Sequence, residues 1–228
     1  MKNLIGICTI ILTLAGCSVQ MEEQENGRQE FVYMRDIIPD VVLDVRYFSD
    51  DNFMGVRVDG YRKPVVLISK TAGRALANVQ AELRDQGLGL KVFDAYRPQK
   101  AVDHFVRWAA DPTDTLTKTR YYPELPKDRL FDLGYISAKS GHTRGSTVDL
   151  TIINLATGEE LDMGSGWDFF GEISHHDSPL VDEQATANRS LLRDLMVKHG
   201  FRAITTEWWH YTLRDEPFPD TYFDFDVE

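Results

Sequence analysis

The strongest constraint on the fold of this chain is a pair of separated segments that both carry metal-binding side chains. The run Ser140-Gly-His-Thr-Arg-Gly-Ser-Thr-Val-Asp149 supplies His142 and Asp149, and Glu207-Trp-Trp-His210 follows far downstream. A catalytic zinc takes three ligands from His, Asp or Glu and leaves its fourth position to water, whose pKa falls to about 7. The two segments offer three such ligands and a spare carboxylate, Glu207, which can act as the base. They must therefore meet in the folded protein.

The N-terminus predicts an export signal over residues 1–17. Lys2 precedes a largely apolar stretch, Leu4 to Leu14, that is too short to span a bilayer. The stretch ends in Leu14-Ala15-Gly16-Cys17, which resembles the lipobox of bacterial lipoproteins, where the cysteine is lipidated after cleavage. We expect an exported protein that a lipid anchor on Cys17 holds to a bacterial membrane, facing the periplasm or the cell surface. An ordinary secretory signal with a chance cysteine is the alternative.

Cysteine usage agrees with export. Cys8 lies inside the predicted signal and Cys17 is the predicted lipid site, so the mature domain has no thiol and cannot form a disulfide. Nitrogen and oxygen ligands must therefore hold any zinc ion, which suits a catalytic site better than a Cys-rich structural one. Residues 18–30 are polar and lack an apolar period, which predicts a flexible tether.

Composition excludes one class of partner. The formal net charge is -11 and the pI is near 5.0, and no basic stripe occurs. Nucleic-acid binding needs clustered Lys and Arg to neutralise phosphates, so we expect no nucleic-acid partner. The 228 residues, 43% of them hydrophobic, are enough for one large core, and no second linker interrupts residues 31–228. We expect one catalytic domain there; no feature favours a particular oligomer.

Helical and strand patterns alternate along this domain and predict an α+β fold. Helical spacing predicts helices over residues 69–86, from Pro98 to before Pro112, and over 184–199. Strand patterns occupy residues 90–96, 147–153 and 205–213. The last strand raises a difficulty, because positions 207 and 210 would point to opposite faces of a regular strand. Either Glu207 acts as a base from beside the strand, or a bulge re-aims one side chain.

Taken together, the motifs resemble the D-alanyl-D-alanine dipeptidases, the branch of zinc D,D-peptidases that includes the vancomycin-resistance dipeptidase. The resemblance runs from Asp44 to the C-terminus. The motifs, in order, are Asp44-Val-Arg-Tyr47, Asp51-Asn-Phe-Met-Gly55, Val58-Asp-Gly-Tyr61, Asp94-Ala-Tyr-Arg-Pro98, the SGHTRGSTVD run, Asp162-Met-Gly-Ser-Gly-Trp-Asp168, Ser174-His-His176, Glu207-Trp-Trp-His-Tyr211 and the tail from Arg214 to Phe225. The resemblance implies a single compact zinc D,D-peptidase domain with a central, antiparallel-rich sheet flanked by helices.

The resemblance also implies roles for the residues of the metal site. His142, Asp149 and His210 would hold one zinc ion per chain, and Glu207 would be the general base that takes a proton from water and delivers it to the leaving amine. Arg97 would stabilise the developing oxyanion together with zinc, although a structural ion pair is the alternative role for this residue. Asp94, three residues earlier, is a plausible orienting partner of Arg97.

The implied substrate is the small dipeptide D-Ala-D-Ala. Asp168, Tyr47 and Ser140 correspond to positions that line the family's pocket and bind the dipeptide's termini, and Asp168 suits an ammonium group. Four other histidines are interpreted as structural or solvated: His104, His175, His176 and His199.

The lipoprotein leader departs from the family pattern, because an enzyme anchored outside the cell cannot drain a cytoplasmic dipeptide pool. We expect it to scavenge D-Ala-D-Ala released from the cell wall. Three alternatives stay open: a D,D-carboxypeptidase or endopeptidase acting on longer muropeptides, a non-catalytic zinc-containing module that binds the wall, and a lipoprotein with a structural role only.

Overall fold

The computed structural model describes residues 27–228. The predicted export signal, Cys17 and most of the predicted tether lie outside the described residues. Residues 27–30, at the end of that tether, form a turn in which the Glu30 amide donates to the Gly27 carbonyl, and Arg28 forms an ion pair with Glu228. Within residues 27–228, no helix combines the length and the apolar character that crossing a membrane requires.

A five-stranded sheet forms the centre of the molecule. Its strands, in spatial order, are β2 (Val42–Leu43), β4 (Leu88–Asp94), β5 (Thr147–Asn154), β7 (His210–Leu213) and β6 (Phe201–Ala203). The pair of β2 and β4 is parallel, and each of the other three pairs is antiparallel. A second, two-stranded antiparallel sheet joins β1 (Phe31–Tyr33) to β3 (Leu67–Ser69). The predicted α+β class with an antiparallel-rich central sheet is confirmed.

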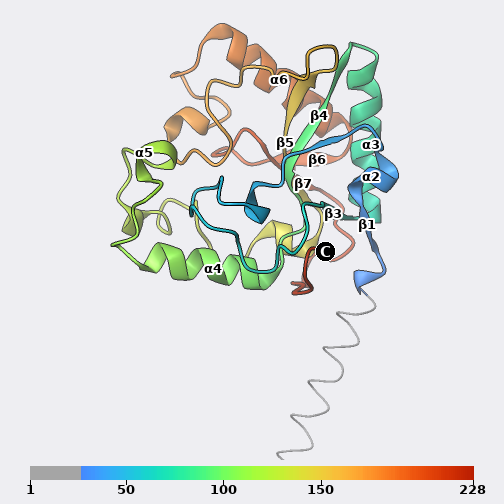
Figure 1. Cartoon of the computed structure of the whole chain (residues 1–228). Helices are drawn as coiled ribbons and strands as arrows, with labels where there is room; N and C mark the ends of the chain where they lie inside the picture. The colour runs from blue at the N-terminus through green and yellow to red at the C-terminus, as the bar shows by residue number, and fades with distance from the viewer. Residues whose placement is uncertain (1–26) are drawn as a thin grey trace, which may run out of the picture.

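Three long helices pack around this sheet. They are α3 (Lys70–Arg84), α4 (Gln99–Ala110) and α6 (Glu183–Lys198). Ser69 caps the N-terminus of α3, because its hydroxyl accepts from the Ala72 amide, and the helix buries an apolar face that includes Leu76 and Val79. Asp182 caps α6 in the same way. Figure 1 shows α3 on the right and α4 at the bottom left, with β4 and β5 between them.

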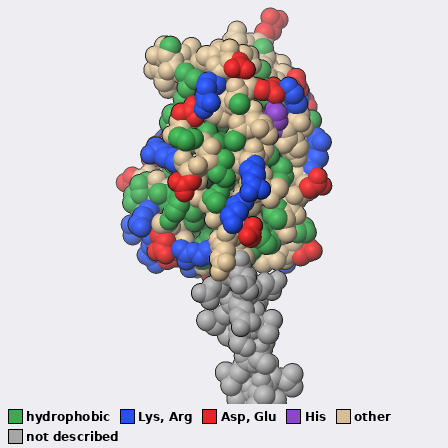
Figure 2. Space-filling model, turned by 90° about the vertical axis from the view of Figure 1, so that its right-hand side faces the viewer, with side chains coloured by type: hydrophobic (Ala, Val, Ile, Leu, Met, Phe, Trp, Pro, Cys, Tyr) green, Lys and Arg blue, Asp and Glu red, His purple; other side chains and the backbone are tan. Residues whose placement is uncertain are grey.

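Short elements complete the chain. They are the helices α2 (Met34–Ile37) and α5 (Lys118–Tyr121) and the 3-10 turns η1 (Arg46–Phe48), η2 (Lys127–Arg129), η3 (Gly141–Arg144) and η4 (Glu172–Ser174). The C-terminal tail returns to β1, where the Tyr33 hydroxyl donates to the Glu228 carbonyl. The face seen in Figure 2 carries basic and acidic side chains interspersed with hydrophobic ones.

Two predicted strands differ from the structure. Strand β4 occupies residues 88–94 instead of 90–96, because the backbone turns away at Ala95 to reach the start of α4. The predicted strand over 205–213 is wrong in its first half, since β7 begins only at His210. The preceding residues form a turn in which the His210 amide donates to the Glu207 carbonyl, and the Trp208 amide donates to the distant Ser174 carbonyl. Glu207 therefore lies in a loop. The alternation of a regular strand, which would point Glu207 and His210 to opposite faces, does not apply to it.

Candidate metal centre and active site

The predicted site residues meet around one small cavity of about 170 Å³. Its lining includes every predicted site residue within the described part of the chain: Tyr47, Arg97, Ser140, His142, Asp149, Asp168, Glu207 and His210. Apolar walls come from residues such as Phe105, Tyr135 and Phe170. The cavity thus combines an apolar wall with a few convergent polar groups, as binding sites commonly do.

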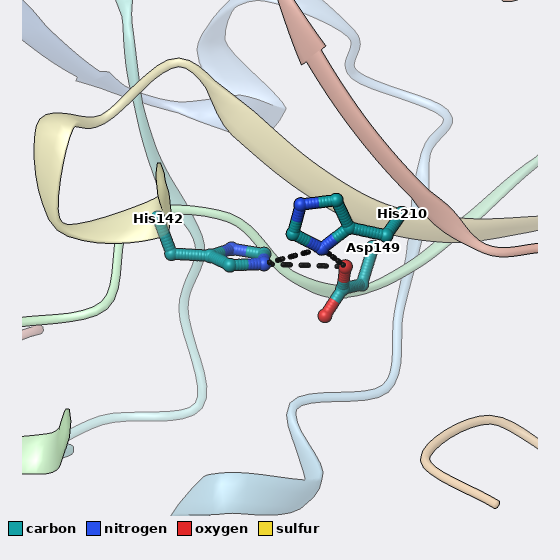
Figure 3. A group of neighbouring side chains, drawn as sticks. All are labelled: His142, Asp149 and His210. Atoms are coloured by element: carbon teal, nitrogen blue, oxygen red, sulfur yellow. Dashed lines mark hydrogen bonds and ion pairs between the residues drawn. The ribbon is translucent and has the colours of Figure 1, made fainter. Parts of the chain in front are cut away.

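Three of these residues form a group that could hold a metal ion (Figure 3). His142 lies on η3, Asp149 in β5 and His210 at the first position of β7. Asp149 Oδ1 is 3.2 Å from His142 Nε2 and 3.1 Å from His210 Nδ1, and the two nitrogens are 3.2 Å apart. The three atoms therefore form a nearly equilateral triangle.

This triangle has the dimensions that zinc requires. Zinc binds His nitrogen and carboxylate oxygen at about 2.0–2.1 Å in a tetrahedral arrangement, so neighbouring ligand atoms lie roughly 3.3 Å apart. Asp149 Oδ1 is completely buried and, within residues 27–228, has no partner with hydrogen-bonding geometry despite the two nearby ring nitrogens. Burying a carboxylate oxygen without a hydrogen-bond partner lowers the stability of the fold unless a bound cation compensates its charge. The donor set and its spacing fit zinc.

The surroundings hold two of the three residues, His142 and Asp149, in the state that binds metal. His142 Nδ1 lies 2.7 Å from the Ala95 carbonyl, which accepts its proton and leaves Nε2 free to face the other ligands. Burial lowers the pKa of His142 and so favours the neutral ring. Burial alone would raise the pKa of Asp149, but His142 and His210 hold it well below its usual range. A neutral imidazole and an ionised carboxylate are what metal binding needs.

The second oxygen of Asp149 is held separately. Trp167 Nε1 donates to Asp149 Oδ2 at 3.4 Å, and Arg97 Nη2 lies 3.5 Å from the same oxygen. This leaves Oδ1 directed at the two histidines. The contact with Trp167 was not predicted, although Trp167 lies in the Asp162-to-Asp168 motif.

Glu207 lies beside this group. Its Oε2 is 3.5 Å from His210 Nδ1, and the turn before β7 places it on the cavity wall. Burial raises the pKa of Glu207 to about 7, and the Asp149 carboxylate acts in the same direction. A carboxylate whose pKa lies near neutrality is suited to accept and return a proton.

Arg97 has a carboxylate partner and still faces the cavity. Its Nε and Nη2 each lie 2.9 Å from Asp94 Oδ2, and its guanidinium stacks over the Tyr47 and Phe105 rings. Tyr61 donates to Asp94 Oδ1 at 2.7 Å. Asp94 thus orients Arg97, as the spacing suggested, and the contribution of Tyr61 was not predicted.

Asp168 is a buried acid with an unusual backbone. Its φ is 59°, the only positive value for a non-glycine residue within the described part of the chain. Such strain persists only where the surroundings enforce it, and it is concentrated at functional sites. The Tyr47 hydroxyl donates to Asp168 Oδ2 at 2.6 Å. Burial and the nearby carboxylates of Asp149 and Glu207 raise the pKa of Asp168 well above its usual value, so a cation placed here would stabilise the ionised form.

Ser140 has a structural task in addition to its place on the cavity wall. Its hydroxyl accepts from the His142 amide at 3.2 Å and so caps η3. The remaining histidines lie outside this wall. His104 contacts Asp59, His199 contacts Glu82, His175 lies 3.4 Å from the Tyr135 hydroxyl, and His176 is buried beside Tyr211.

A cavity lined by three side chains that could hold a metal ion and by a further carboxylate is typical of a metal-dependent hydrolase, and the comparisons identify the family of this chain. The model of the D-ala-D-ala dipeptidase family matches residues 27–228, so this chain belongs to that family. The family consists of zinc-dependent peptidases, and zinc is therefore the cofactor of this chain.

Three bacterial relatives support this assignment. Proteins named D-alanyl-D-alanine dipeptidase from Streptomyces coelicolor, Enterococcus faecalis and Enterococcus faecium are 46%, 44% and 42% identical to this chain. The alignments cover 87%, 89% and 87% of this chain and 98%, 99% and 98% of those proteins. A solved vancomycin-resistance D,D-pentapeptidase, VanY, in complex with Zn(II), is 14% identical, with a TM-score of 0.41 over 68% of this chain and 77% of that one. That likeness is too distant to bear on the chemistry of this site.

Proposed function

We propose that this protein hydrolyses D-Ala-D-Ala to two molecules of D-alanine with zinc held by His142, Asp149 and His210. One observation carries the proposal: the three ligand atoms lie 3.1–3.2 Å apart in the same cavity that Glu207 lines. The relatives of similar length, each named for this activity, support the choice of substrate.

Glu207 is the general base and then the general acid of the reaction. Zinc, when bound, supplies Lewis-acid polarisation of the peptide carbonyl and acidifies water. Glu207 accepts a proton from the water whose oxygen forms the new bond to the carbonyl carbon. The carbon–nitrogen bond then breaks, and Glu207 returns the proton to the leaving amine. Its position 3.5 Å from His210 supports this role.

Arg97 donates to the carbonyl oxygen as negative charge develops there. Its guanidinium keeps Nε and Nη2 on Asp94 and lies on the cavity wall, so its direction is fixed before substrate arrives. A donor that is already oriented stabilises charge without reorganisation at the moment of reaction.

Asp168 binds the ammonium group of the dipeptide. It is a buried acid without an ion-pair partner within residues 27–228, and Tyr47 orients its carboxyl group. A free amino terminus would supply the missing cation, which favours a dipeptide over a longer peptide whose amine is blocked. Ser140 lines the wall beside His142 and completes the binding site.

The site of action that we propose is outside the cytoplasm, where the enzyme scavenges dipeptide released from the cell wall. The support is in the sequence: an apolar segment that ends in Leu14-Ala15-Gly16-Cys17. Membrane fractionation of cells that express the native chain or the Cys17→Ser variant tests this. Native protein in the cytosolic fraction with its leader uncleaved would contradict it.

The test of the activity measures D-alanine release from D-Ala-D-Ala by the purified protein. We expect release to stop with a chelator, to return with added zinc and to fall at least about 100-fold in Glu207→Gln. Release from a pentapeptide ending in D-Ala-D-Ala, but not from the dipeptide, would instead favour a D,D-carboxypeptidase. Bound zinc with no hydrolysis of either would favour a wall-binding module.

A further inference from the structure

The cavity contains a second cationic residue that the proposed mechanism does not use. Within residues 27–228, the cations that line the cavity are Arg97 and Lys139, and they face three carboxylates: Asp149, Asp168 and Glu207. A dipeptide carries a carboxylate at its C-terminus. Zinc, when bound, would offset the charge of Asp149 and act on the peptide carbonyl, so a separate cation is needed to pair with the terminal carboxylate.

Arg97 is already committed to two carboxylates. Its guanidinium lies 2.9 Å from Asp94 and 3.5 Å from Asp149, and two aromatic rings cover it. A guanidinium that is shared in this way, and that also serves the carbonyl oxygen, has little capacity left for the terminal carboxylate of the substrate.

Lys139 is not paired with a carboxylate of residues 27–228. It is exposed and directly precedes Ser140. Its Nζ lies 4.8 Å from the centre of the Tyr222 ring, a cation–π contact that restrains the ammonium. Arg144 approaches the same ring at 5.8 Å and is held by two 2.8 Å hydrogen bonds to Glu216. The C-terminal tail therefore positions Lys139 at the cavity.

We propose that Lys139 binds the free C-terminal carboxylate of the substrate and so restricts the enzyme to peptides with an unblocked carboxyl end. The inference rests on the proposed function and extends it, because Asp168 then selects one terminus and Lys139 the other. A zwitterionic dipeptide is the substrate class that satisfies both.

The test compares the wild type with Lys139→Met, which keeps the length of the side chain and removes its charge, and with Lys139→Arg, which keeps the charge. Lys198→Met is the matched control, because Lys198 lies on α6 and pairs with Glu82 on the surface. Each zinc-loaded protein is assayed with D-Ala-D-Ala and with its C-terminal amide, which lacks the negative charge. If the amide is not cleaved, its affinity is measured instead as its inhibition constant when it competes with D-Ala-D-Ala.

We expect Lys139→Met to raise the KM for D-Ala-D-Ala about tenfold with little change in kcat, and to leave the value for the amide unchanged, since a charge-assisted contact is lost only with the free acid. Lys139→Arg and Lys198→Met should stay within about threefold of the wild type for both compounds. Equal losses on the acid and the amide, or no loss on either, would overturn the inference.

The same proteins separate this inference from the proposed function. If the wild type cleaves neither compound, the proposed function fails. Calorimetric titration of the dipeptide and its amide into the wild type and Lys139→Met then decides the role of Lys139. Binding of the dipeptide that weakens about tenfold in the variant, with binding of the amide unchanged, supports the inference. Equal binding by both proteins overturns it.

Discussion

Asp149 and His210 are register partners on neighbouring strands β5 and β7, and Asp149 Oδ1 lies 3.1 Å from His210 Nδ1. On the other side of β5, Asp94 of β4 is paired with Asp149. Two predicted metal ligands, His210 and Asp149, therefore lie in one row with Asp94, which orients Arg97. The row crosses three hydrogen-bonded strands. A site built on a sheet holds its geometry more closely than one built on loops.

Asp149→Asn should abolish tight zinc binding. The amide cannot supply an anionic oxygen to the ion, so we expect zinc affinity to fall by at least about 100-fold, measured by competition with a chromophoric chelator. Thr151→Val is the matched control, since Thr151 lies on the same strand and its buried hydroxyl has no partner within residues 27–228. Wild-type zinc affinity in Asp149→Asn would contradict the assignment of this ligand.

Glu207→Gln should separate catalysis from metal binding. The amide keeps the shape of the side chain and cannot accept the proton, so we expect kcat to fall by about 10² to 10⁴ while zinc content and KM change little. Steady-state kinetics on D-Ala-D-Ala with metal analysis of the same sample checks this. A kcat within about tenfold of the wild type would mean that another group acts as the base.

Local patterns predicted the long elements well, and the structure brings the three predicted ligand residues together. Apolar residues at helical spacing placed α3, and Ser69 and Asp149 lie where their motifs suggested, because a capped helix and a buried strand are encoded over a few neighbouring residues. Strands β1 and β3 were missed because each is three residues long, too short for alternation to be visible.

Long-range contacts explain the remaining errors. The aromatic and Thr content near Glu207 favours a strand, but the Trp208 amide donates to the carbonyl of Ser174, far earlier in the chain, and the segment forms a turn instead. The contacts of Trp167 with Asp149 and of Tyr61 with Asp94 likewise join distant segments. The local periodicity of a sequence does not indicate which distant residues will be in contact in the folded protein.

Arg97→Lys should show whether Arg97 acts on the substrate or only pairs with Asp94. A lysine could keep one contact with Asp94 but not also reach the carbonyl oxygen in the same geometry, so we expect kcat to fall by about 10² to 10³. Asp94→Asn, which keeps the shape of the side chain but removes the charge that orients Arg97, should cost about tenfold. Thermal unfolding of both variants provides the control for stability. Equal losses of kcat in the two variants would mean that Arg97 serves only in the ion pair.

Glu216→Gln should loosen the turn that carries His142. Arg144 follows His142 by two residues and donates two 2.8 Å hydrogen bonds to Glu216, whose side chain is only 5% exposed. Removing one partner of a mostly buried pair should cost about 2 kcal/mol in the free energy of unfolding and weaken zinc binding. Glu228→Gln is the control in the same tail, because its pair with Arg28 is exposed and should contribute at most about 1 kcal/mol. Similar urea midpoints for the two variants would contradict this.

His176 should make the stability of the protein depend on pH between about 4 and 6.5. The side chain is 5% exposed, and neither ring nitrogen has a hydrogen-bond partner within residues 27–228. Burial, with the charge of Arg193, lowers the pKa of His176 from 6.5 to about 4. The unfolded chain therefore binds a proton at a higher pH than the folded chain, and stability falls as the pH drops through this window.

His176→Phe should remove this dependence, because a phenyl ring fills the buried space without a titratable nitrogen. Relative to pH 7, the wild type should lose about 2 kcal/mol more than the variant at pH 5, measured by urea unfolding of both proteins at each pH. Comparing the two proteins cancels the other groups that titrate in the same range. A difference in stability between wild type and variant that is the same at pH 7 and pH 5 would show that His176 keeps its ordinary pKa in the folded protein.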